Sequence, residues 1–271
     1  MEMKGGDTFA TQARGRADGR QVAVTEADWL RGQLASFRRK EERALRLIEQ
    51  AARPVGIAFS GGKDSTVTLD LVRRVFPDAI VGFYDSGAEL QDTLDLIAAT
   101  TNVQVIPAGG GGLIELCKQN GYWGHEPESP TPQPVDFAAE LIYKPAREFV
   151  QRNGLQAVAL GLRADEAVGR RINARTKGEY YHADYADVYH LCPVQFWTED
   201  EIWAYIAKHD LPYNRAYDAM TALGIPRAHQ RICTNLGTDA ASFGRYVYLK
   251  QLDPGLWNRL AREFPLIRKY A

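Results

Sequence analysis

Apolar residues along this chain follow two alternating patterns, short continuous runs and stretches at helical spacing. The continuous runs predict buried strands, and the stretches between them predict amphipathic helices. Strands that alternate with helices favour right-handed crossovers and a parallel sheet covered on both faces. The predicted fold is an α/β, doubly wound, mostly parallel five-stranded sheet with a helical C-terminal extension. The predicted strands are 55–59, 79–85, 103–107, 156–163 and 188–194.

The same pattern divides the chain into four segments. Residues 1–24 carry few large apolar groups and are expected to be a disordered leader. A helical pattern over 25–53 begins at Thr25, with Asp28 three residues later as in a capping box. This helix is placed to pack on a partner protein or on a second copy of the chain. Residues 54–211 hold the predicted sheet, and 212–271 form the C-terminal extension.

Polar or glycine-rich segments follow four of the predicted strands, at 60–65, 85–87, 108–112 and 161–163. Ligands of open α/β sheets bind beyond the carboxyl ends of the strands, so these segments are expected to meet in one site. A proline-rich stretch without a periodic pattern, 121–136, predicts a long loop of the kind that serves as a lid.

Composition and charge restrict the class of protein only loosely. The formal net charge is −1, so the whole chain has no polyanion-binding signature. The three cysteines are far apart and include no Cys-x-x-Cys pair, which favours a reducing compartment over a disulfide framework. No apolar run is long enough to cross a bilayer, and the N-terminus has no signal-peptide core. We therefore expect a cytoplasmic enzyme that has no contact with a membrane.

The segment Ser-Gly-Gly-Lys-Asp-Ser lies directly after the first predicted strand. The common P-loop has a glycine six residues before its lysine and Ser or Thr after it, whereas this chain has Ile57 and Asp64 there. Backbone N–H groups at bare glycines and the positive end of the following helix still favour an anion. Lys63 adds a cation, and Ser60 and Ser65 add hydroxyl groups. The alternative is a tight turn in which Ser60 only caps the helix.

This hexapeptide resembles the PP-loop of the ATP pyrophosphatase, or adenine nucleotide α-hydrolase, superfamily. Three further segments resemble its phosphoadenylyl-sulfate (PAPS) reductase-like branch. YDSGAEL is similar to an Asp-Thr-Gly segment, and GLRADEAVGRR to a Gly-Leu-Arg-x-x-Glu segment. Residues 192–218 are similar to a Pro-Leu…Trp-Thr-x-x-Asp-Ile-Trp…Pro-Tyr-Asn-x-Leu-Tyr-Asp stretch. The resemblance identifies 54–211 as a PP-loop nucleotide-binding domain.

The resemblance implies that ATP or a related adenine nucleotide binds with Mg²⁺ and is cleaved at the α-phosphate with release of pyrophosphate. Lys63 and the loop amides would stabilise the leaving group. Asp64 either holds the metal or, as we favour, belongs to the first turn of the helix, and no metal ligand is assigned. Catalytic roles are expected for Lys63, Asp64, Arg163 and Arg171, and nucleotide contacts for Ala58, Phe59, Ser60, Gly61, Gly62, Lys63, Asp64, Ser65, Asp85, Ser86, Gly87, Gly161, Arg163 and Arg170.

A basic stretch surrounds the third of these motifs. Arg163 ends a predicted central strand, where its guanidinium would meet a phosphate or sulfate directly. Arg170, Arg171, Arg175 and Lys177 follow it with few acidic residues between them. The alternative for this group is a solvated helix face.

The chain differs from the reductases that it resembles in the positions of its cysteines. The enzymes that it resembles end in a mobile Glu-Cys-Gly-x-His segment or use paired cysteines for an iron–sulfur cluster. This chain has no cysteine after Cys233. Cys117 and Cys192 are expected to be small core residues. Two alternatives are less favoured, a convergence of all three cysteines on an iron–sulfur cluster and a reactive thiol at Cys233 beside Arg231.

Three functions remain open. The first is a PP-loop enzyme of sulfate activation or sulfur transfer, similar to the catalytic subunit of sulfate adenylyltransferase, which needs no catalytic cysteine and works with a GTPase. The second is a sulfonucleotide reductase that uses Cys233 or a thiol from a partner. The third is a nucleotide-binding module associated with nucleic acid, whose phosphates would contact 163–177 and 227–231.

Overall fold

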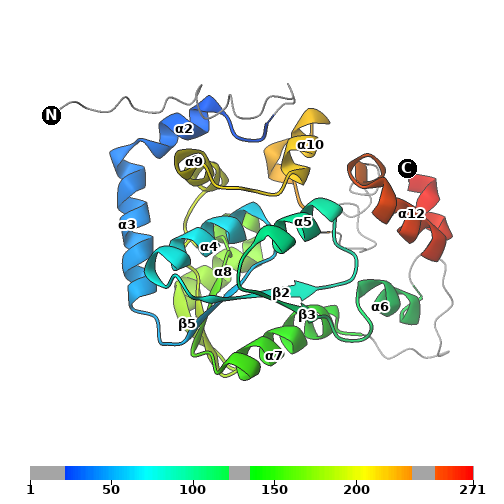
Figure 1. Ribbon diagram of the computed structural model, residues 1–271, viewed down its shortest axis with the longest axis horizontal. Coiled ribbons are helices and arrows are strands. Elements are labelled where there is room, and N and C mark those ends of the chain that lie inside the picture. The colour runs from blue at the N-terminus through cyan, green and yellow to red at the C-terminus, as the bar shows by residue number, and fades with distance from the viewer. Residues whose placement is uncertain (1–21, 122–134, 234–247, 271) are drawn as a thin grey trace.

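The computed structural model describes residues 22–121, 135–233 and 248–270. Most of the expected leader, 1–21, and most of the expected lid loop, 122–134, lie outside the described residues. The described residues form a sheet with helices packed on both of its faces, as Figure 1 shows.

The sheet has six strands in the order β3-β2-β1-β4-β6-β5. All neighbouring strands are parallel except β5, which pairs antiparallel with β6. The predicted α/β class is confirmed, but the predicted number of strands was one too small, because β5 is a Tyr-rich edge strand without an apolar run. The strands are β1 (Val55–Ala58), β2 (Ile80–Asp85), β3 (Val103–Pro107), β4 (Ala157–Leu160), β5 (Tyr180–Ala183) and β6 (Val188–Leu191).

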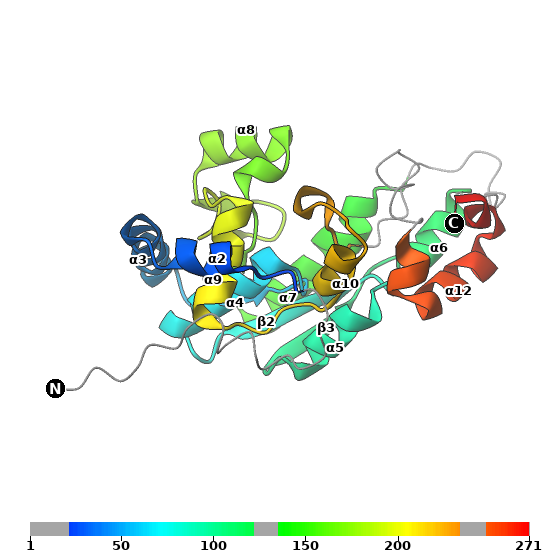
Figure 2. The ribbon, with the colours of Figure 1, turned by 90° about the horizontal axis from the view of Figure 1, so that it is seen from above.

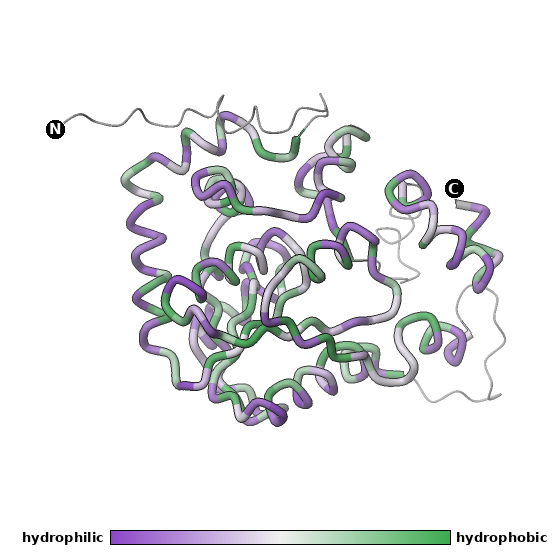
Figure 3. Tube along the Cα trace, viewed as in Figure 1, coloured by the Kyte–Doolittle hydropathy of each residue, from purple (hydrophilic) through white to green (hydrophobic). Residues whose placement is uncertain are grey.

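Two buried clusters of apolar side chains lie on the two faces of the sheet. On one face, Phe149 of α7 packs with Ile106 and Val158, and on the other, Leu71 of α4 packs with Trp203 of α9. Figure 3 shows apolar positions gathered along the strands and the inner sides of these helices. The helices of the sheet region are α4 (Lys63–Val75), α5 (Gln91–Ala99), α6 (Leu113–Gln119), π-helix η2 (Ala139–Tyr143), α7 (Lys144–Asn153), 3-10 helix η3 (Ala164–Glu166), α8 (Val168–Lys177) and α9 (Glu199–His209).

The predicted N-terminal helix is divided into two. Helix α2 (Glu26–Gly32) and helix α3 (Ala35–Glu49) meet at Leu34, which has extended backbone angles. Thr25 and Asp28 form the expected capping box, and Thr198 and Glu201 form a second one at α9. Helix α2 packs against α9, so this N-terminal part is attached to the body of the molecule.

The C-terminal extension is helical in its described part, as predicted. It comprises α10 (Ala216–Ala222), the 3-10 helix η4 (Arg227–His229), α12 (Pro254–Glu263) and the 3-10 helix η5 (Pro265–Tyr270). Figure 2 shows α8 standing away from the body of the molecule. Within the described ranges, no helix combines the length and the apolar character that spanning a membrane needs.

Candidate active site

The turn from β1 to α4 has the backbone geometry of an anion cradle. Gly61 has a φ of +72°, which side-chain-bearing residues rarely adopt, and α4 begins at Lys63. Two of the turn's N–H groups have long hydrogen bonds: Gly62 donates to Ser60 Oγ at 3.4 Å and Lys63 to the Tyr217 hydroxyl at 3.3 Å. Such weak bonds are readily exchanged for stronger bonds to a charged oxyanion.

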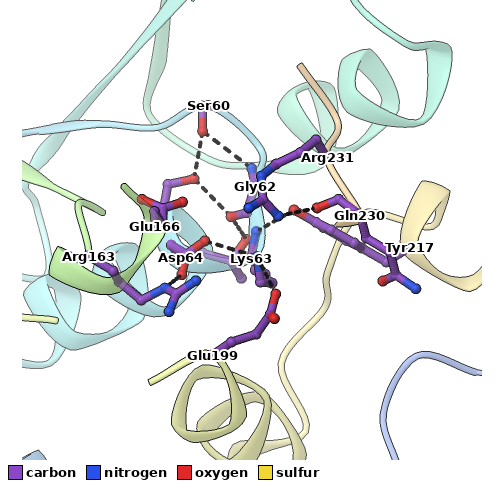
Figure 4. Close-up of polar contacts among 12 residues, drawn as sticks. Ser60, Gly62, Lys63, Asp64, Arg163, Glu166, Glu199, Tyr217, Gln230 and Arg231 are labelled. Atoms are coloured by element: carbon purple, nitrogen blue, oxygen red, sulfur yellow. Dashed lines mark hydrogen bonds and ion pairs between the residues drawn. The ribbon is translucent and has the colours of Figure 1, made fainter. Parts of the chain in front are cut away.

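Lys63 is a buried cation at the start of α4. Its side chain is 2% exposed, and its Nζ lies 3.3 Å from Asp64 Oδ2 and 3.2 Å from Glu199 Oε1 (Figure 4). The ammonium group also lies over the Tyr217 ring, 5.6 Å from its centroid. Burial alone lowers the pKa of Lys63, but the attraction of Tyr217, Asp64 and Glu199 outweighs it and raises that pKa. Lys63 therefore keeps its charge at neutral pH.

Arg163 and Asp64 form a second buried ion pair beside the turn. The Arg163 side chain is 3% exposed and donates to Asp64 Oδ1 and to Asp165. Asp64 thus bridges Arg163 and Lys63, in the first turn of α4 that we expected for it. The strand was predicted to end at Arg163, but β4 ends at Leu160, so Arg163 lies in the segment that follows, where these two carboxylates hold its guanidinium group.

Two further arginines extend the positive field around the turn. Arg170 pairs with Glu166 on the outer side. Burial lowers the pKa of Arg170, and the charges of Arg163 and Arg231 lower it further, against the attraction of Asp64. Arg231 belongs to the segment after η4 and lies beside the glycine turn in Figure 4.

Gly161 explains how β4 approaches the turn so closely. A Cβ at Gly161 would lie 2.6 Å from the Ser65 backbone nitrogen and 2.7 Å from the Asp64 carbonyl carbon. Only glycine allows this approach. Gly161 was expected to line an adenine pocket, but it is not among the residues that line the cavity described next, and it acts here as a spacer.

A cavity of about 460 Å³ adjoins the glycine turn. Its walls come from the ends of β1 and β2, from the π-helix η2, and from the segment that carries Ile232 and Cys233. Ala58 and Phe59 line it, as expected from the sequence. The full lining is Ala58, Phe59, Ser60, Gly82, Phe83, Tyr84, Ser86, Glu89, Leu113, Phe137, Ala138, Leu141, Ile142, Ile232 and Cys233.

The turn after β2 borders the same cavity. The Gly87 N–H donates to Asp85 Oδ1 at 2.8 Å, and the Ser86 hydroxyl donates to Glu89 Oε1 at 2.6 Å. The Ser86 carbonyl accepts from the Leu113 N–H at 2.8 Å, which joins this turn to the start of α6. Of the four segments predicted to converge, 60–65 and 85–87 both border this cavity, whereas no residue of 108–112 or 161–163 is among its described lining residues.

The three thiols have different surroundings. Cys117 and Cys192 are buried, as expected, and burial raises the pKa of each thiol to about 12. Cys233 is exposed and lines the cavity. No three His, Cys, Asp or Glu side chains among the described residues are grouped as metal ligands, so the cysteines do not converge there.

Several predicted residues lie outside this arrangement. Arg171 is exposed on α8, and its side chain has no hydrogen bond or ion pair with a described residue, so its catalytic role stays a prediction. Arg175 and Lys177 are also exposed on α8. Arg227, expected on nucleic-acid phosphates, instead donates to Asp28 at 2.9 Å and is tied to the N-terminal segment.

Other residues of the site were missed by sequence reasoning. Glu199 had no local signal, because Lys63, with which it pairs, lies far away along the chain. Glu89 lies in the YDSGAEL segment and Arg231 in the basic segment 227–231, but neither residue was assigned to the nucleotide. Tyr217 had one: it belongs to the Pro-Tyr-Asn…Tyr-Asp segment that resembles the family. Its hydroxyl contact with Lys63 gives that segment a structural role at the turn.

Mg²⁺, which the resemblance implies, does not fit a protein-held site among the described residues. Both Asp64 oxygens are in ion pairs, Glu199 is paired with Lys63, and no third ligand of that kind is grouped with them. Mg²⁺ in such enzymes is commonly held by substrate phosphates, and no step proposed for this chain relies on it.

Comparison with known proteins agrees with this geometry. The family model "Phosphoadenosine phosphosulfate reductase domain" matches residues 54–239. An adenosine 5'-phosphosulfate reductase of Staphylococcus haemolyticus is 31% identical over 185 residues, 65% of this chain and 71% of that protein. An uncharacterised protein of Methanocaldococcus jannaschii is 27% identical over 82% of this chain but only 43% of its own length.

The fold also has a relative among solved structures. A phosphoadenylyl-sulfate reductase from Candida auris, in complex with phosphate, is similar with a TM-score of 0.52 and 19% identity, over 74% of this chain and 90% of that chain. At that identity the likeness shows the fold alone. The family match covers well over half of the chain and, with the fold and the glycine turn, leads to one conclusion: the protein belongs to the phosphoadenosine phosphosulfate reductase family.

Proposed function

We propose that this chain binds ATP or a related adenine nucleotide with its phosphates on the glycine turn and cleaves it at the α-phosphate, in sulfate activation or sulfur transfer. One observation carries the proposal. A buried, charged Lys63 and the amides of the glycine turn lie beside an apolar cavity of about 460 Å³, large enough for a nucleoside. The phosphates would meet the cations and the base would enter the cavity.

In this reaction an oxygen nucleophile attacks the α-phosphorus. The bond between that phosphorus and the bridging oxygen breaks, and pyrophosphate leaves with the electron pair. Negative charge then grows on the leaving group, where Lys63, Arg231 and the turn amides would stabilise it. With water as the nucleophile the products are AMP and pyrophosphate.

The test is a product assay with ATP labelled at the α-phosphate, in the presence of Mg²⁺. We expect AMP and pyrophosphate, and we expect Lys63→Ala to lower the rate about 100-fold or more. Lys250→Ala, at an exposed position, is the matched control and should keep the wild-type rate. ADP as the product, or an unchanged rate in Lys63→Ala, would contradict the proposal.

Removal of Lys63 leaves Asp64 and Glu199 without their shared cation, so folding has to be checked separately. Thermal melting of Lys63→Ala and of Lys63→Ala with Glu199→Gln answers this. Asp64 keeps its ion pair with Arg163, so the double variant removes the one carboxylate that is left unpaired, Glu199, and should melt higher than the single variant. If the double variant is folded and its rate is still low, the low rate results from the loss of the Lys63 charge in the reaction and not from unfolding.

A second candidate, sulfonucleotide reduction, is favoured by the position of Cys233 in the wall of the cavity that Ser60 also lines. A Cys233 thiolate would attack the sulfur of adenylyl sulfate, break the S–O bond to the phosphate and release AMP. The sulfonate carried by Cys233 would then be released as sulfite by a second thiol from a reductant. Sulfite release that Cys233→Ser abolishes, without turnover of ATP, would favour this candidate over the first.

A further inference from the structure

Among the described residues that line the cavity beside the glycine turn, most are apolar and one, Glu89, has a carboxylate. Glu89 lines it together with apolar side chains such as Phe83, Leu113 and Leu141. In such a pocket the few polar groups fix the orientation of the ligand and provide specificity. Glu89 is therefore placed to decide which ligand fits.

Glu89 is held in a defined position. The Ser86 hydroxyl donates to its Oε1 at 2.6 Å, and the Ser86 N–H donates to the same oxygen at 3.3 Å. No hydrogen bond from a described residue goes to Oε2, so this oxygen can accept one from a ligand. Ser86 itself is fixed by the bond from the Leu113 N–H.

Among the described residues, the cavity wall has no cation that could bind a second phosphate group. None of the described lining residues is Lys, Arg or His, and the described cations of the site lie around the glycine turn. Burial raises the pKa of Glu89, and the nearby Asp85 raises it further, against the hydrogen bonds from Ser86. Additional negative charge placed here would be unfavourable, whereas a hydrogen-bond donor would be favoured.

The fold indicates which part of a bound nucleotide would lie next to Glu89. Ser86 and Glu89 belong to the turn after β2, at the same carboxyl edge of the sheet as the glycine turn. The side chains of the π-helix η2, including Leu141 and Ile142, provide the apolar part of the wall. With the phosphates on the glycine turn and the base against the apolar wall, the ribose would lie next to the turn after β2, which carries Ser86 and Glu89. In dinucleotide-binding sheets an acidic residue after β2 accepts from ribose hydroxyls and disfavours a ribose phosphate.

We propose that Glu89 accepts hydrogen bonds from the ribose hydroxyls, so that this site takes adenine nucleotides with both ribose hydroxyls free and rejects those with a 3'-phosphate. The inference rests on the proposed function, because it assumes that the phosphates occupy the glycine turn. It names the substrate class as ATP or adenylyl sulfate rather than a 3'-phosphorylated sulfonucleotide.

The test measures dissociation constants by calorimetry for AMP and for adenosine 3',5'-bisphosphate, two unreactive ligands that differ only at the 3' position. We expect the wild-type chain to favour AMP at least 10-fold, and Glu89→Gln to reduce this ratio at least 10-fold. Glu49→Gln, at an exposed position of α3, removes the same charge and should leave the ratio unchanged. The preference for ATP over 3'-deoxyadenosine triphosphate should fall in Glu89→Gln as well.

Ser86→Ala provides a second variant if Glu89→Gln folds poorly, since it releases the carboxylate without removing it. It should weaken the ribose preference without altering the preference for ATP over inosine triphosphate. An unchanged AMP preference in folded Glu89→Gln, or a wild-type preference for the bisphosphate, would overturn the inference.

Two outcomes separate the inference from the function on which it rests. In the first outcome, ATP and AMP bind, and Glu89→Gln changes the preference for ATP over inosine triphosphate but not the preference for AMP over the bisphosphate. The inference is then wrong, and the proposed function still stands. If neither nucleotide binds at millimolar concentration to the folded wild-type chain, the proposed function fails with it.

Discussion

Gly161 shows how a single missing side chain shapes the site. The end of β4 lies so close to the first turn of α4 that a Cβ would meet backbone atoms of Asp64 and Ser65. These atoms cannot rotate away, because they belong to the helix that begins at the glycine turn. The space that Gly161 leaves therefore controls the position of both Asp64 and the turn.

Gly161→Ala should consequently be destabilising. We expect a loss of about 2–3 kcal/mol in the free energy of unfolding, typical of strong overpacking, together with weaker nucleotide binding. The matched control is Gly169→Ala in α8, where a Cβ would meet nothing within 4 Å and alanine favours the helix. Urea denaturation measures both, and equal stabilities of the two variants would contradict this account.

The sequence predicted the residues of the glycine turn because their signal is local: a strand, a glycine pair, a cation and a helix follow one another. It also predicted Asp64 in the first helical turn and Arg163 close to the end of its strand. It did not predict that Glu199 would pair with Lys63, because helix α9 reaches the turn only through the packing of the fold. Glu89 and Arg231 lie in segments that the sequence singled out, but the sequence did not indicate that their side chains belong to the nucleotide site.

At the scale of elements, α3 and α9 are joined through one buried carboxylate. Glu41 of α3 is 7% exposed and pairs with Lys208 and with His209, whose Nε2 lies 2.6 Å from Glu41 Oε1. Burial raises the pKa of Glu41, but the hydrogen bonds from His209 and Lys208 outweigh it, so the folded-state pKa lies below 4.5. Glu41 therefore stabilises the fold in its charged form.

This stabilisation should depend on pH. Because the folded pKa is depressed, the contribution is present above the unfolded pKa and is lost as the pH falls through the folded value. Glu41→Gln should cost about 1.5–3 kcal/mol at pH 7 and progressively less at acid pH. Glu42→Gln, on the exposed side of α3, should cost little at either pH.

Urea denaturation of both variants at pH 7 and at pH 3.5 provides the comparison. A difference between Glu41→Gln and wild type that stays constant over this range would show that the charge of Glu41 does not join α3 to α9.

The elements that sequence reasoning missed depend on their neighbours. Strand β5 contains Tyr180, Tyr181 and His182, which have no apolar run, and it forms because β6 offers a partner in a hairpin. Likewise, the helical pattern over 25–53 continues through Leu34, yet the chain bends there so that α2 can pack on α9. Strands β1 to β4 and their order along the chain were predictable because each is a buried apolar run.

At the scale of the whole molecule, the cavity is completed by a segment far along the chain. Ile232 and Cys233 form part of its wall, together with residues of β1, β2 and the turns that follow them. The Ile232 Cδ1 lies 3.7 Å from the place that a Cβ on Gly62 would take. A ligand in the cavity would therefore lie against Cys233.

Nucleotide binding should protect Cys233 from alkylation. Cys117 and Cys192 are buried with raised pKa values and should not react with iodoacetamide in the folded protein, whereas Cys233 should. Mass spectrometry of the alkylated peptides is expected to show modification of Cys233 that decreases at least several-fold with saturating ATP. Alkylation of Cys233 at an unchanged rate in saturating ATP would place the ligand away from this wall.

The wall that Ile232 and Cys233 provide also bears on synthesis. While the chain emerges from the ribosome, the glycine turn leaves the tunnel long before residue 233 does, and until then the cavity stays open on that side. A half-made chain thus has the phosphate cradle without the enclosure that would retain a nucleoside. A nucleotide that binds in the cavity would therefore stabilise only chains in which Ile232 and Cys233 have already packed into the wall. The last folding step would then depend on the concentration of nucleotide in the cell.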